Sequence, residues 1–514
     1  RIYAYFKEKH SPKEQADFLR KEYGIGGSSH AVSGASHSGE DHSGKGVSLK
    51  KQDCPEIQLN WANVAKRISE LIRKDRFLTP EEKTQYEQLQ RQTAARSAAR
   101  NDYNAIKEAR PDDIVLFQVG DFFEMYGEDA KQAAELGVEM LVLDDGWFGK
   151  RDDDLAGLGD WTVNEKKLGM PLGKVAEKIR GLGMKFGIWI EPEMVCEDSD
   201  LYREHPDWAF TIPGRKPVRA RYQLVLDYSR KEVVDGIFAQ IAKVLDDTKA
   251  DYVKMDMNRH LTDIWSKTAA EQNQGAILHR YVLGVYDFLE RLHERYPDLL
   301  IEGCSGGGGR FDAGMLYYTP QIWCSDNTDA VERIKIQYGT SFAYPSCTVG
   351  SHVSAVPNHQ TGRMTEVAMA GSFGYELDLN LLTEEEKEQV REQIKNYHRF
   401  EMLIRQGRYY RLTDVWQTKE YAAWEYCAPD ESEALVTVIT MDTQCNPATE
   451  YVKLRGLGED KKYRVEVVGM QTDGENVQRI NGTPNAVEPE YFTGAQLVYA
   501  GLPVPRLGNE YKSW

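Results

Sequence analysis

The sequence predicts an α/β protein: a (β/α)8 TIM barrel, followed by a C-terminal antiparallel β-sandwich and preceded by a mostly helical and loop N-terminal segment. Between about residues 112 and 414, short apolar runs alternate with amphipathic helical patterns, which is typical of parallel strands joined by helices. From about residue 415 the helical patterns stop, and apolar residues alternate with polar ones between Gly, Asp and Asn turns. Neither a G-x-G-x-x-G motif nor a Walker A loop follows any predicted strand, so a doubly wound nucleotide-binding sheet is the weaker alternative.

Eight barrel strands are expected, because eight short apolar runs of strand length occur in this part of the chain. Most of them are followed by a helical pattern, which favours a closed parallel barrel. The runs are IVLFQV (114–119), VEMLVL (138–143), KFGIWI (185–190), YVKMD (252–256), LLIEG (299–303), PQIWCS (320–325), SFAYPS (341–346) and EVAMAGS (366–372).

Three of the helical patterns are strong. Residues 171–183 begin with Pro171 and place Leu172, Val175 and Ile179 on one face before ending at glycines. Residues 229–245 begin with Ser229-x-x-Glu232, the pattern of a capping box, and residues 276–296 form a third amphipathic helix.

We expect three regions, residues 1–110, 111–414 and 415–514. The first contains a Gly/Ser/His-rich stretch at 24–46, which we interpret as a solvated loop, and a polar linker helix before the barrel. This region is mildly basic and the remainder is strongly acidic, with a formal net charge of −17 for the whole chain. That acidity disfavours a general nucleic-acid binder.

Several other classes of protein are disfavoured by what the sequence lacks. The seven cysteines are scattered without a C-x-x-C pair, and no His-x-His or His-Glu-x-x-His pattern indicates a metal site. No apolar run has membrane-spanning length, the first ten residues lack a signal-peptide core, and no nucleophile elbow follows a strand. We therefore expect a cytoplasmic protein that requires no metal or cofactor and binds no membrane.

Polar residues gather where the predicted strands end. In DYVKMDMNRH (251–260), alternation puts Lys254, Asp256 and Asn258 on one face of a strand. Other strand ends carry Asp144-Asp145, Glu191 and Glu193, Cys304-Ser305-Gly306, and Asp326. Because the reacting groups of a (β/α)8 barrel lie at the carboxyl ends of its strands, these residues predict one carboxylate-rich site. Paired carboxylates without metal-binding histidines suit glycosidic bond cleavage.

Residues from about 134 to 514 closely resemble bacterial α-galactosidases of glycoside hydrolase family 36. The resemblance is carried by LDDGWFGKRDDD, FGIWIEPEMV, RYQLVLDYSR, KMDMNRH, the long run from CSGGGGRFD to QIWCSDNTDAVERIKIQYGTS, and GSHVSAVPNHQTGR. It implies a retaining hydrolase of α-galactoside oligosaccharides such as melibiose and raffinose. By motif, Asp256 would be the nucleophile and Asp326 the acid/base.

The resemblance also implies a galactose pocket. In it Asp144 and Asp145 would bind the 4- and 6-hydroxyls and Lys254 a neighbouring hydroxyl, while the remaining wall would consist of Arg221, Asn258, Trp189, Cys304 and Gly306. Cys304 and Gly306 would crowd the 2-position and so disfavour a 2-acetamido sugar. From the residues alone, Asp145 as a turn cap, Trp189 as barrel core and Cys304 as an inert thiol remain alternatives, and Glu191 and Glu193 are expected to support the site from behind.

The resemblance fails at the N-terminal end. The family's large leading β-sandwich and its Asn-Asn-Trp-Glu-Ala motif are absent from this sequence. Residues 111–136 instead resemble the lead domain of mismatch-repair ATPases, and residues 1–110 resemble helicase-like proteins of mobile elements. We expect a fusion in which 111–136 supplies the first barrel strand and helix, with Asp121 or Phe122 at the barrel mouth.

Three other functions stay open beside the α-galactosidase. They are an inactive fusion product, a transglycosylase or α-N-acetylgalactosaminidase on the same scaffold, and a nucleic-acid-binding mobile-element protein. The sequence also leaves open the preferred oligosaccharide, the role of residues 1–136 and the oligomeric state, with a homo-oligomer among the alternatives.

Overall fold

The computed structural model describes residues 127–354, 365–379, 382–442, 450–466, 468 and 490–503. All of them belong to one compact unit, Arg91–Trp514. The predictions for residues 1–110, for a strand at 114–119, and for Asp121 and Phe122 lie outside the described residues. Within the described residues, no helix is both long and apolar enough to span a bilayer.

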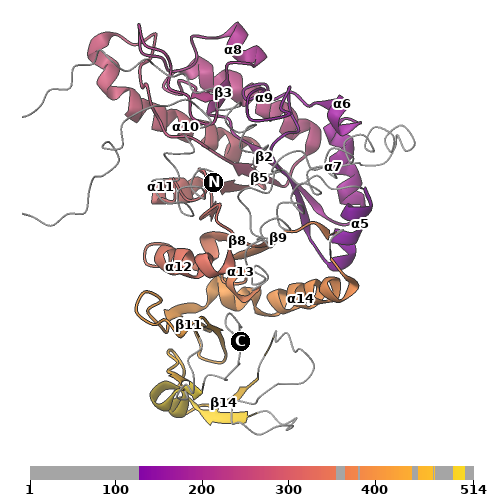
Figure 1. Ribbon diagram of the computed structural model, residues 1–514, viewed down its shortest axis with the longest axis vertical. Helices are drawn as coiled ribbons and strands as arrows, with labels where there is room; N and C mark the ends of the chain where they lie inside the picture. The colour runs from indigo at the N-terminus through magenta and orange to yellow at the C-terminus, as the bar shows by residue number, and fades with distance from the viewer. Residues whose placement is uncertain are drawn as a thin grey trace, which may run out of the picture. The chain divides into compact units, whose positions relative to one another are not determined.

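A seven-stranded parallel sheet forms the centre of the first part (Figure 1). Its strands pair in the order β1-β2-β5-β6-β7-β8-β9, each parallel to the next. Their bounds are β1 (Met140–Leu143), β2 (Lys185–Ile190), β5 (Tyr252–Met255), β6 (Leu300–Gly303), β7 (Gln321–Trp323), β8 (Val349–Ser354) and β9 (Ser372–Glu376). The order and direction are those of a (β/α)8 barrel, and β1 and β9 are the two end strands of the described sheet.

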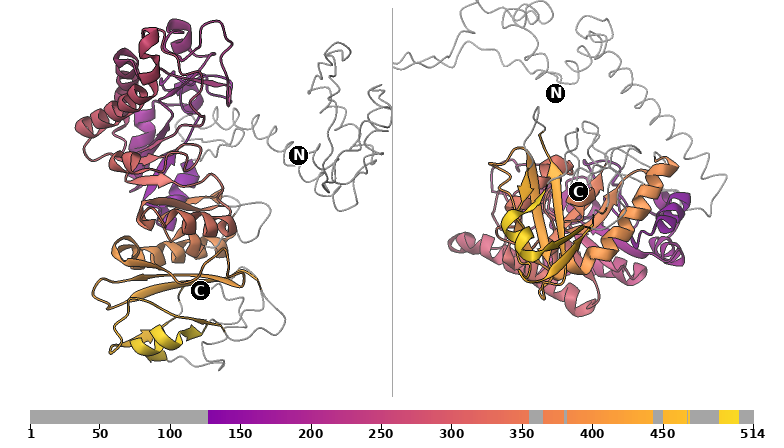
Figure 2. Two further views of the ribbon diagram at one scale, coloured as in Figure 1. Left: turned by 90° about the vertical axis from the view of Figure 1, so that its left-hand side faces the viewer. Right: turned by 90° about the horizontal axis from the view of Figure 1, so that it is seen from below.

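Helices connect most of these strands, as the sequence pattern predicts (Figures 1 and 2). A short antiparallel pair, β3 (Met194–Cys196) and β4 (Gln223–Val225), follows β2. The helical elements of this part are α5 (Gly127–Leu136), α6 (Glu165–Leu168), α7 (Leu172–Gly181), α8 (Asp200–Glu204), α9 (Lys231–Thr248), η1 (Glu271–Ala276), α10 (Ile277–Arg295), α11 (Ala313–Tyr318), α12 (Ala330–Thr340), η2 (Ser346–Thr348) and α13 (Thr365–Ala368).

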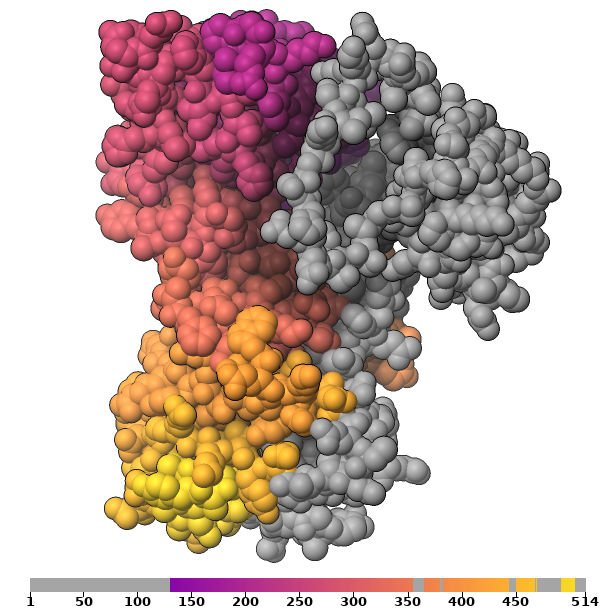
Figure 3. Space-filling view, turned by 60° about the vertical axis from the view of Figure 1, so that its left-hand side comes forward, coloured from indigo at the N-terminus to yellow at the C-terminus, as the bar shows by residue number. Residues whose placement is uncertain are grey.

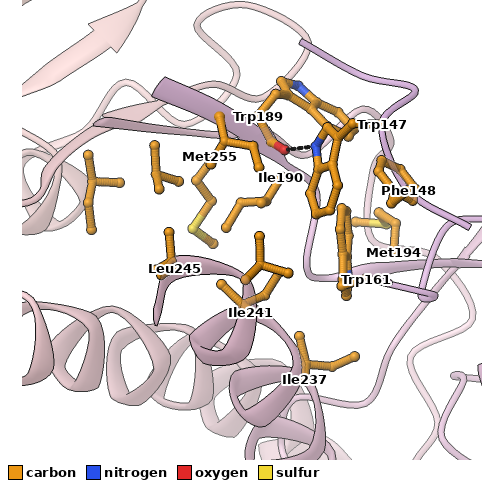
Figure 4. Packing of buried hydrophobic residues seen from close by; sticks show 14 of the residues in the cluster. Trp147, Phe148, Trp161, Trp189, Ile190, Met194, Ile237, Ile241, Leu245 and Met255 are labelled. Atoms are coloured by element: carbon orange, nitrogen blue, oxygen red, sulfur yellow. Dashed lines mark hydrogen bonds between the residues drawn. The ribbon is translucent and has the colours of Figure 1, made fainter. Parts of the chain in front are cut away.

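The strands place apolar side chains against the helices on one face and turn the other face inward. Val253 and Met255 of β5 are completely buried in the core that α9 completes. Figure 4 shows Met255 beside Ile241 and Leu245, which project from α9 toward the sheet. The predicted alternation along β5 is therefore confirmed, and Lys254 and Asp256 belong to the other face.

An aromatic cluster closes the core beside β2. Trp147, Phe148 and Trp161 pack around Trp189, with the Phe148 and Trp189 rings stacked at a centroid distance of 6.2 Å. The Trp147 indole N–H donates to the Trp189 carbonyl at 2.9 Å, the dashed bond in Figure 4. These contacts fix the segment after β1 against the end of β2.

Two of the eight predicted strands are wrong. Residues 341–346 form the turn after α12, and the strand begins at Val349; residues 366–372 cover α13 and a turn, and the strand begins at Ser372. Short apolar runs do not distinguish helix, turn and strand by periodicity, and Pro345 has no N–H to donate to a ladder. The true strand β8, VGSHVS, was missed because its inward residues are polar.

The predicted capping box at Ser229 is also wrong. Helix α9 begins at Lys231 with Arg230 as N-cap and no side-chain cap, and the Ser229 hydroxyl donates instead to the Asp227 carboxylate. The motif fails because the helix begins one residue later than a cap at Ser229 requires.

The C-terminal part is made of antiparallel strands, as expected. The long helix α14 (Glu384–Gln406) leads into the sheet β10-β11-β12, and two strand pairs follow, β13 with β16 and β14 with β15. The bounds are β10 (Arg408–Arg411), β11 (Tyr421–Cys427), β12 (Ala434–Thr440), β13 (Tyr451–Val452), β14 (Lys462–Val465), β15 (Glu490–Thr493), η4 (Gln496–Ala500) and β16 (Leu502–Pro503).

One apolar cluster joins this part to the last barrel helices. It contains Ala330 and Ile334 of α12, Leu403 of α14, and Ala422 and Trp424 of β11, all buried. In the space-filling view the orange and yellow residues of the C-terminal part lie directly against the salmon residues that precede them (Figure 3). The antiparallel sheet therefore shares a core with the barrel helices.

Candidate active site

Asp256 lies directly after β5, at the carboxyl end of the strand, and is 6% exposed. Its Oδ1 accepts the backbone N–H groups of Met257 (2.7 Å) and Gly306 (3.2 Å). Its Oδ2 accepts the Asn258 side-chain amide (2.6 Å) and the Trp189 indole N–H (3.3 Å). Four donors hold this buried carboxylate in one orientation.

Asp326 follows β7, two strands from β5 in the sheet, and its side chain is exposed. The pKa of Asp326 is raised above its ordinary value, first because the protein partly shields the carboxyl group from water and then because of the nearby charge of Asp256. A carboxyl group that is protonated more readily than usual suits a general acid.

A glycine turn after β6 separates these two aspartates. Gly306 donates to Asp256, and a Cβ on Gly307 would lie 2.9 Å from the Ser325 Cα and 3.0 Å from the Asp326 backbone nitrogen. Gly307 has φ +86°, which other residues rarely adopt. The glycine run predicted at this strand end therefore allows two acid-bearing loops to approach the same turn.

Lys254 connects the site to the end of β1. Its Nζ donates to Asp144 Oδ2 at 3.3 Å and lies 5.4 Å from the centre of the Trp323 ring. Burial alone would lower the pKa of Lys254, but the surrounding carboxylates, Asp144 first, hold it well above its ordinary value. Lys254 is therefore a permanent cation between the two aspartates and the β1 loop.

Asp145 and Arg221 have partners of their own. Asp145 accepts from Arg151 through both oxygens, with Nη2 to Oδ2 at 2.8 Å, and burial raises the pKa of Asp145 despite that pairing. Arg221 is largely exposed, has φ +50°, and lies 3.6 Å from Asp154 in an ion pair. Both residues border the site. To bind a sugar hydroxyl, each would have to do so while it also keeps its ion-pair partner.

Trp189 and Cys304 lie in the interior. Trp189 is 2% exposed, and its contact with the site is the N–H donated to Asp256. Cys304 is buried beside Asp256, and burial together with that charge raises the pKa of its thiol well above the ordinary value. The structure thus brings Asp144, Lys254, Asp256, Asn258, Gly306 and Asp326 together and puts Trp189 and Cys304 behind them.

Two buried glutamates, Glu191 and Glu193, follow β2 and lie under the site. Glu193 is completely buried, with Arg310 at 2.8 Å and the Tyr281 hydroxyl as partners. Glu191 accepts from the Asn258 backbone N–H and from the Gln223 amide (2.8 Å) through Oε1, while its Oε2 has no hydrogen-bond partner among the described residues. Burial, and then the charge of Asp256, raise the pKa of Glu191 to about 8.

We expect Glu191→Gln to flatten the pH dependence of stability. The folded-state pKa of about 8 lies above the ordinary 4.5, so stability is greatest below the lower value and declines as pH rises between the two. Glu191 contributes up to about 1.4 kcal/mol of that decline per pH unit. Urea unfolding at about pH 5 and about pH 8 measures the slope.

Glu385→Gln, which changes an exposed carboxylate on α14, is the control for this experiment and should leave the slope as in the unmodified protein. A Glu191→Gln slope equal to that of the control would show that Glu191 is ionised in the folded protein.

The residues of this site do not form a metal centre. Across the residues that the structure describes, no three His, Cys, Asp or Glu side chains are grouped so as to hold a metal ion. The site instead offers one buried carboxylate held by hydrogen bonds, a second carboxyl with a raised pKa, and a lysine. Such a set can stabilise a cationic sugar carbon and transfer a proton.

Family comparisons cover most of the described chain. Residues 117–407 match the Melibiase family, and residues 421–514 match the glycosyl hydrolase family 36 C-terminal domain. The first match includes β1 to β9 and both aspartates, and the second begins where β11 begins.

The chain is also similar to individual alpha-galactosidases. The chain is 54% identical over 403 residues to the bifunctional alpha-galactosidase/sucrose kinase AgaSK of Mediterraneibacter gnavus, covering 76% of this chain and 40% of that protein. It is 46% identical over 390 residues to alpha-galactosidase AgaA of Geobacillus stearothermophilus, covering 75% and 50%. The solved structure of AgaA matches with a TM-score of 0.69 over 75% of this chain and 51% of that one. The chain spans about half the length of the curated relatives it matches.

Proposed function

The chain belongs to the Melibiase family of glycoside hydrolases, and on that premise we propose that it is a retaining α-galactosidase. Its substrates would be oligosaccharides with a terminal α-galactosyl residue, such as melibiose and raffinose. The observation that carries this proposal is Asp256, a buried carboxylate held by four donors and separated from Asp326 by the turn at Gly306 and Gly307.

Solved complexes of a relative support the choice of these two residues. Two variants of the Geobacillus enzyme, each with one aspartate replaced, were solved with raffinose and with stachyose. The two replaced aspartates are separated by the same number of residues as Asp256 and Asp326. At 45% identity, equal spacing favours equivalent positions.

In the first step, an Asp256 oxygen forms a bond to the anomeric carbon as the bond to the leaving oxygen breaks, and Asp326 gives its proton to that oxygen. In the second step, water attacks the same carbon, the bond to Asp256 breaks, and Asp326 takes the proton of the water. Asp256 is neutralised in the glycosyl-enzyme. This removes the charge that raises the pKa of Asp326, which then favours its role as a base.

The galactose pocket remains part of the proposal. Asp144 and Lys254 form a paired acid and base that fits neighbouring sugar hydroxyls, and Asn258 and Gly306 are adjacent to Asp256. Asp145 and Arg221 would contribute from their existing ion pairs. Trp189 would act through Asp256, and Cys304 would limit space near the 2-position together with Gly306.

We also infer that residues 111–136 supply the first strand and helix of the barrel. The described part of this stretch, α5, buries Ala130, Ala133 and Leu136 in the barrel core. Helix α5 immediately precedes β1, where the helix of a first β/α unit belongs. Limited proteolysis that cut readily between residues 112 and 137, while the remainder stayed intact, would contradict this.

The full chain should hydrolyse p-nitrophenyl α-galactoside, and NMR taken before mutarotation should show α-galactose as the first product. The 2-acetamido analogue should react at least about tenfold more slowly because the group would clash near Cys304. β-Galactose as first product would overturn the retaining mechanism. Absence of hydrolysis by protein that is folded by circular dichroism would overturn the function.

A further inference from the structure

Asp326 is exposed, yet its side chain has one fixed contact. The Trp323 indole N–H donates to Asp326 Oδ1 at 3.1 Å, and in the described part of the chain no other hydrogen bond to this carboxylate is formed. Trp323 lies on β7, is 3% exposed, and is three residues before Asp326. A buried strand residue therefore contacts the exposed carboxyl of the following loop.

The Trp323 ring is packed by side chains from three other elements. Lys254 Nζ of β5 lies 5.4 Å and Arg333 Cζ of α12 lies 4.5 Å from the ring centre, both within cation–π distance. The His352 ring of β8 packs 4.6 Å from it, and His352 Nδ1 lies 3.2 Å from the Glu376 carboxylate of β9. These contacts leave the indole little freedom to turn its N–H away.

Arg333 also fixes the backbone on either side of Asp326. This buried guanidinium donates to the carbonyls of Ser325 (2.6 Å) and Asn327 (2.8 Å), and to the Gly350 carbonyl of β8 (3.0 Å). The loop is thereby tied to the neighbouring strand. With the backbone held by Arg333 and Oδ1 held by Trp323, Asp326 Oδ2 is the oxygen left to carry a proton.

We propose that Trp323 is the positioning residue for the acid/base Asp326, which it orients and whose anionic form it stabilises through its indole N–H. The proposal rests on the proposed function. When Asp326 gives its proton to the leaving oxygen, it becomes an anion, and the N–H donated to Oδ1 stabilises that anion. When water attacks, the same bond keeps Oδ2 directed at the incoming proton.

The charges that face Asp326 set the direction of the test. Asp256, directly after β5, favours the neutral acid, while Lys254 of β5 and Arg221 before β4 favour the anion, as does the Trp323 N–H. Arg333 and the His352–Glu376 pair lie behind Trp323. Removing the N–H takes away one stabiliser of the anion and leaves the others, so the pKa of Asp326 should rise.

The test compares the unmodified chain with Trp323→Phe and with a variant carrying 3-benzothienylalanine at position 323. The second side chain keeps the two-ring shape but has sulfur in place of the N–H. The basic limb of the kcat/KM profile for melibiose, whose leaving oxygen needs the proton of the acid, should move up by about 0.5 to 1 pH unit. The kcat for melibiose, whose leaving group needs a proton, should fall about tenfold or more, while KM changes little.

Trp424→Phe is the matched control. Trp424 is buried in β11, and its indole N–H has no hydrogen-bond partner among the described residues, so this variant should leave the pH profile unchanged. An active unmodified chain whose benzothienyl variant keeps both the basic limb and the melibiose kcat would overturn the role of Trp323. An unmodified chain without activity would overturn the proposed function itself.

Discussion

Replacing Asp256 with glycine should lower kcat/KM for p-nitrophenyl α-galactoside by at least about 10⁴-fold. The substitution removes the attacking oxygen but leaves the donors of Trp189, Asn258 and Gly306 around an empty space. Added azide should enter that space and restore turnover, with β-galactosyl azide as product, because it attacks from the face that the carboxylate occupied. Mass spectrometry and NMR of the product measure both the rescue and its stereochemistry.

Asp298→Gly is the control for this substitution. Asp298 is an exposed aspartate in the segment before β6, at the amino end of the strands, and its variant should retain the activity of the unmodified chain and form no azide product. A product with the α configuration from Asp256→Gly would assign the nucleophile to another residue.

Replacing Asp326 with glycine should have an effect that depends on the leaving group. For melibiose, kcat/KM should fall by about 10² to 10⁴-fold because the departing sugar oxygen is no longer protonated. For p-nitrophenyl α-galactoside, whose leaving group departs without a proton, the first step should be nearly preserved, and the glycosyl-enzyme on Asp256 should accumulate as a burst of nitrophenol.

Azide distinguishes the two aspartates. In Asp326→Gly it should attack the glycosyl-enzyme from the opposite face and give α-galactosyl azide, the reverse of the outcome at position 256. Equal losses for both substrates, without a burst, would show that Asp326 acts on binding rather than on proton transfer.

The parts of the fold that were predictable from the sequence are those in which one physical pattern dominates. Strands β2 and β5 alternate or bury their side chains continuously, and α7 presents Leu172, Val175 and Ile179 at helical spacing, all of them buried. Strand β8 was missed because a barrel interior accepts polar side chains, so its strand does not read as apolar.

The site was predictable in its positions and less so in its interactions. Alternation along β5 places Lys254 and Asp256 together, and the structure confirms it with the contacts to Asp144 and Gly306. The ion pairs and pKa shifts of the site carboxylates depend on side chains that no local sequence pattern identifies. Arg151 occupies Asp145, and Asp256 raises the pKa of Glu191; neither effect follows from a local pattern.

The contact between Trp323 and Asp326 could not be predicted from the sequence either. In the sequence it is one apolar residue in a short strand, and nothing marks its N–H as directed at Asp326. The signal that points to it is its place as the last residue of β7, where a side chain reaches the carboxyl edge of a barrel.

The apolar cluster shared by α12, α14 and β11 has a consequence for how such proteins change over evolutionary time. Ile334, Leu403 and Trp424 come from both sides of the boundary that the sequence suggests, and each is covered by the others. A recombination event that replaced either the barrel or the C-terminal sheet with an unrelated domain would expose apolar side chains of this cluster to water. We therefore expect the two parts to be retained together when such proteins recombine.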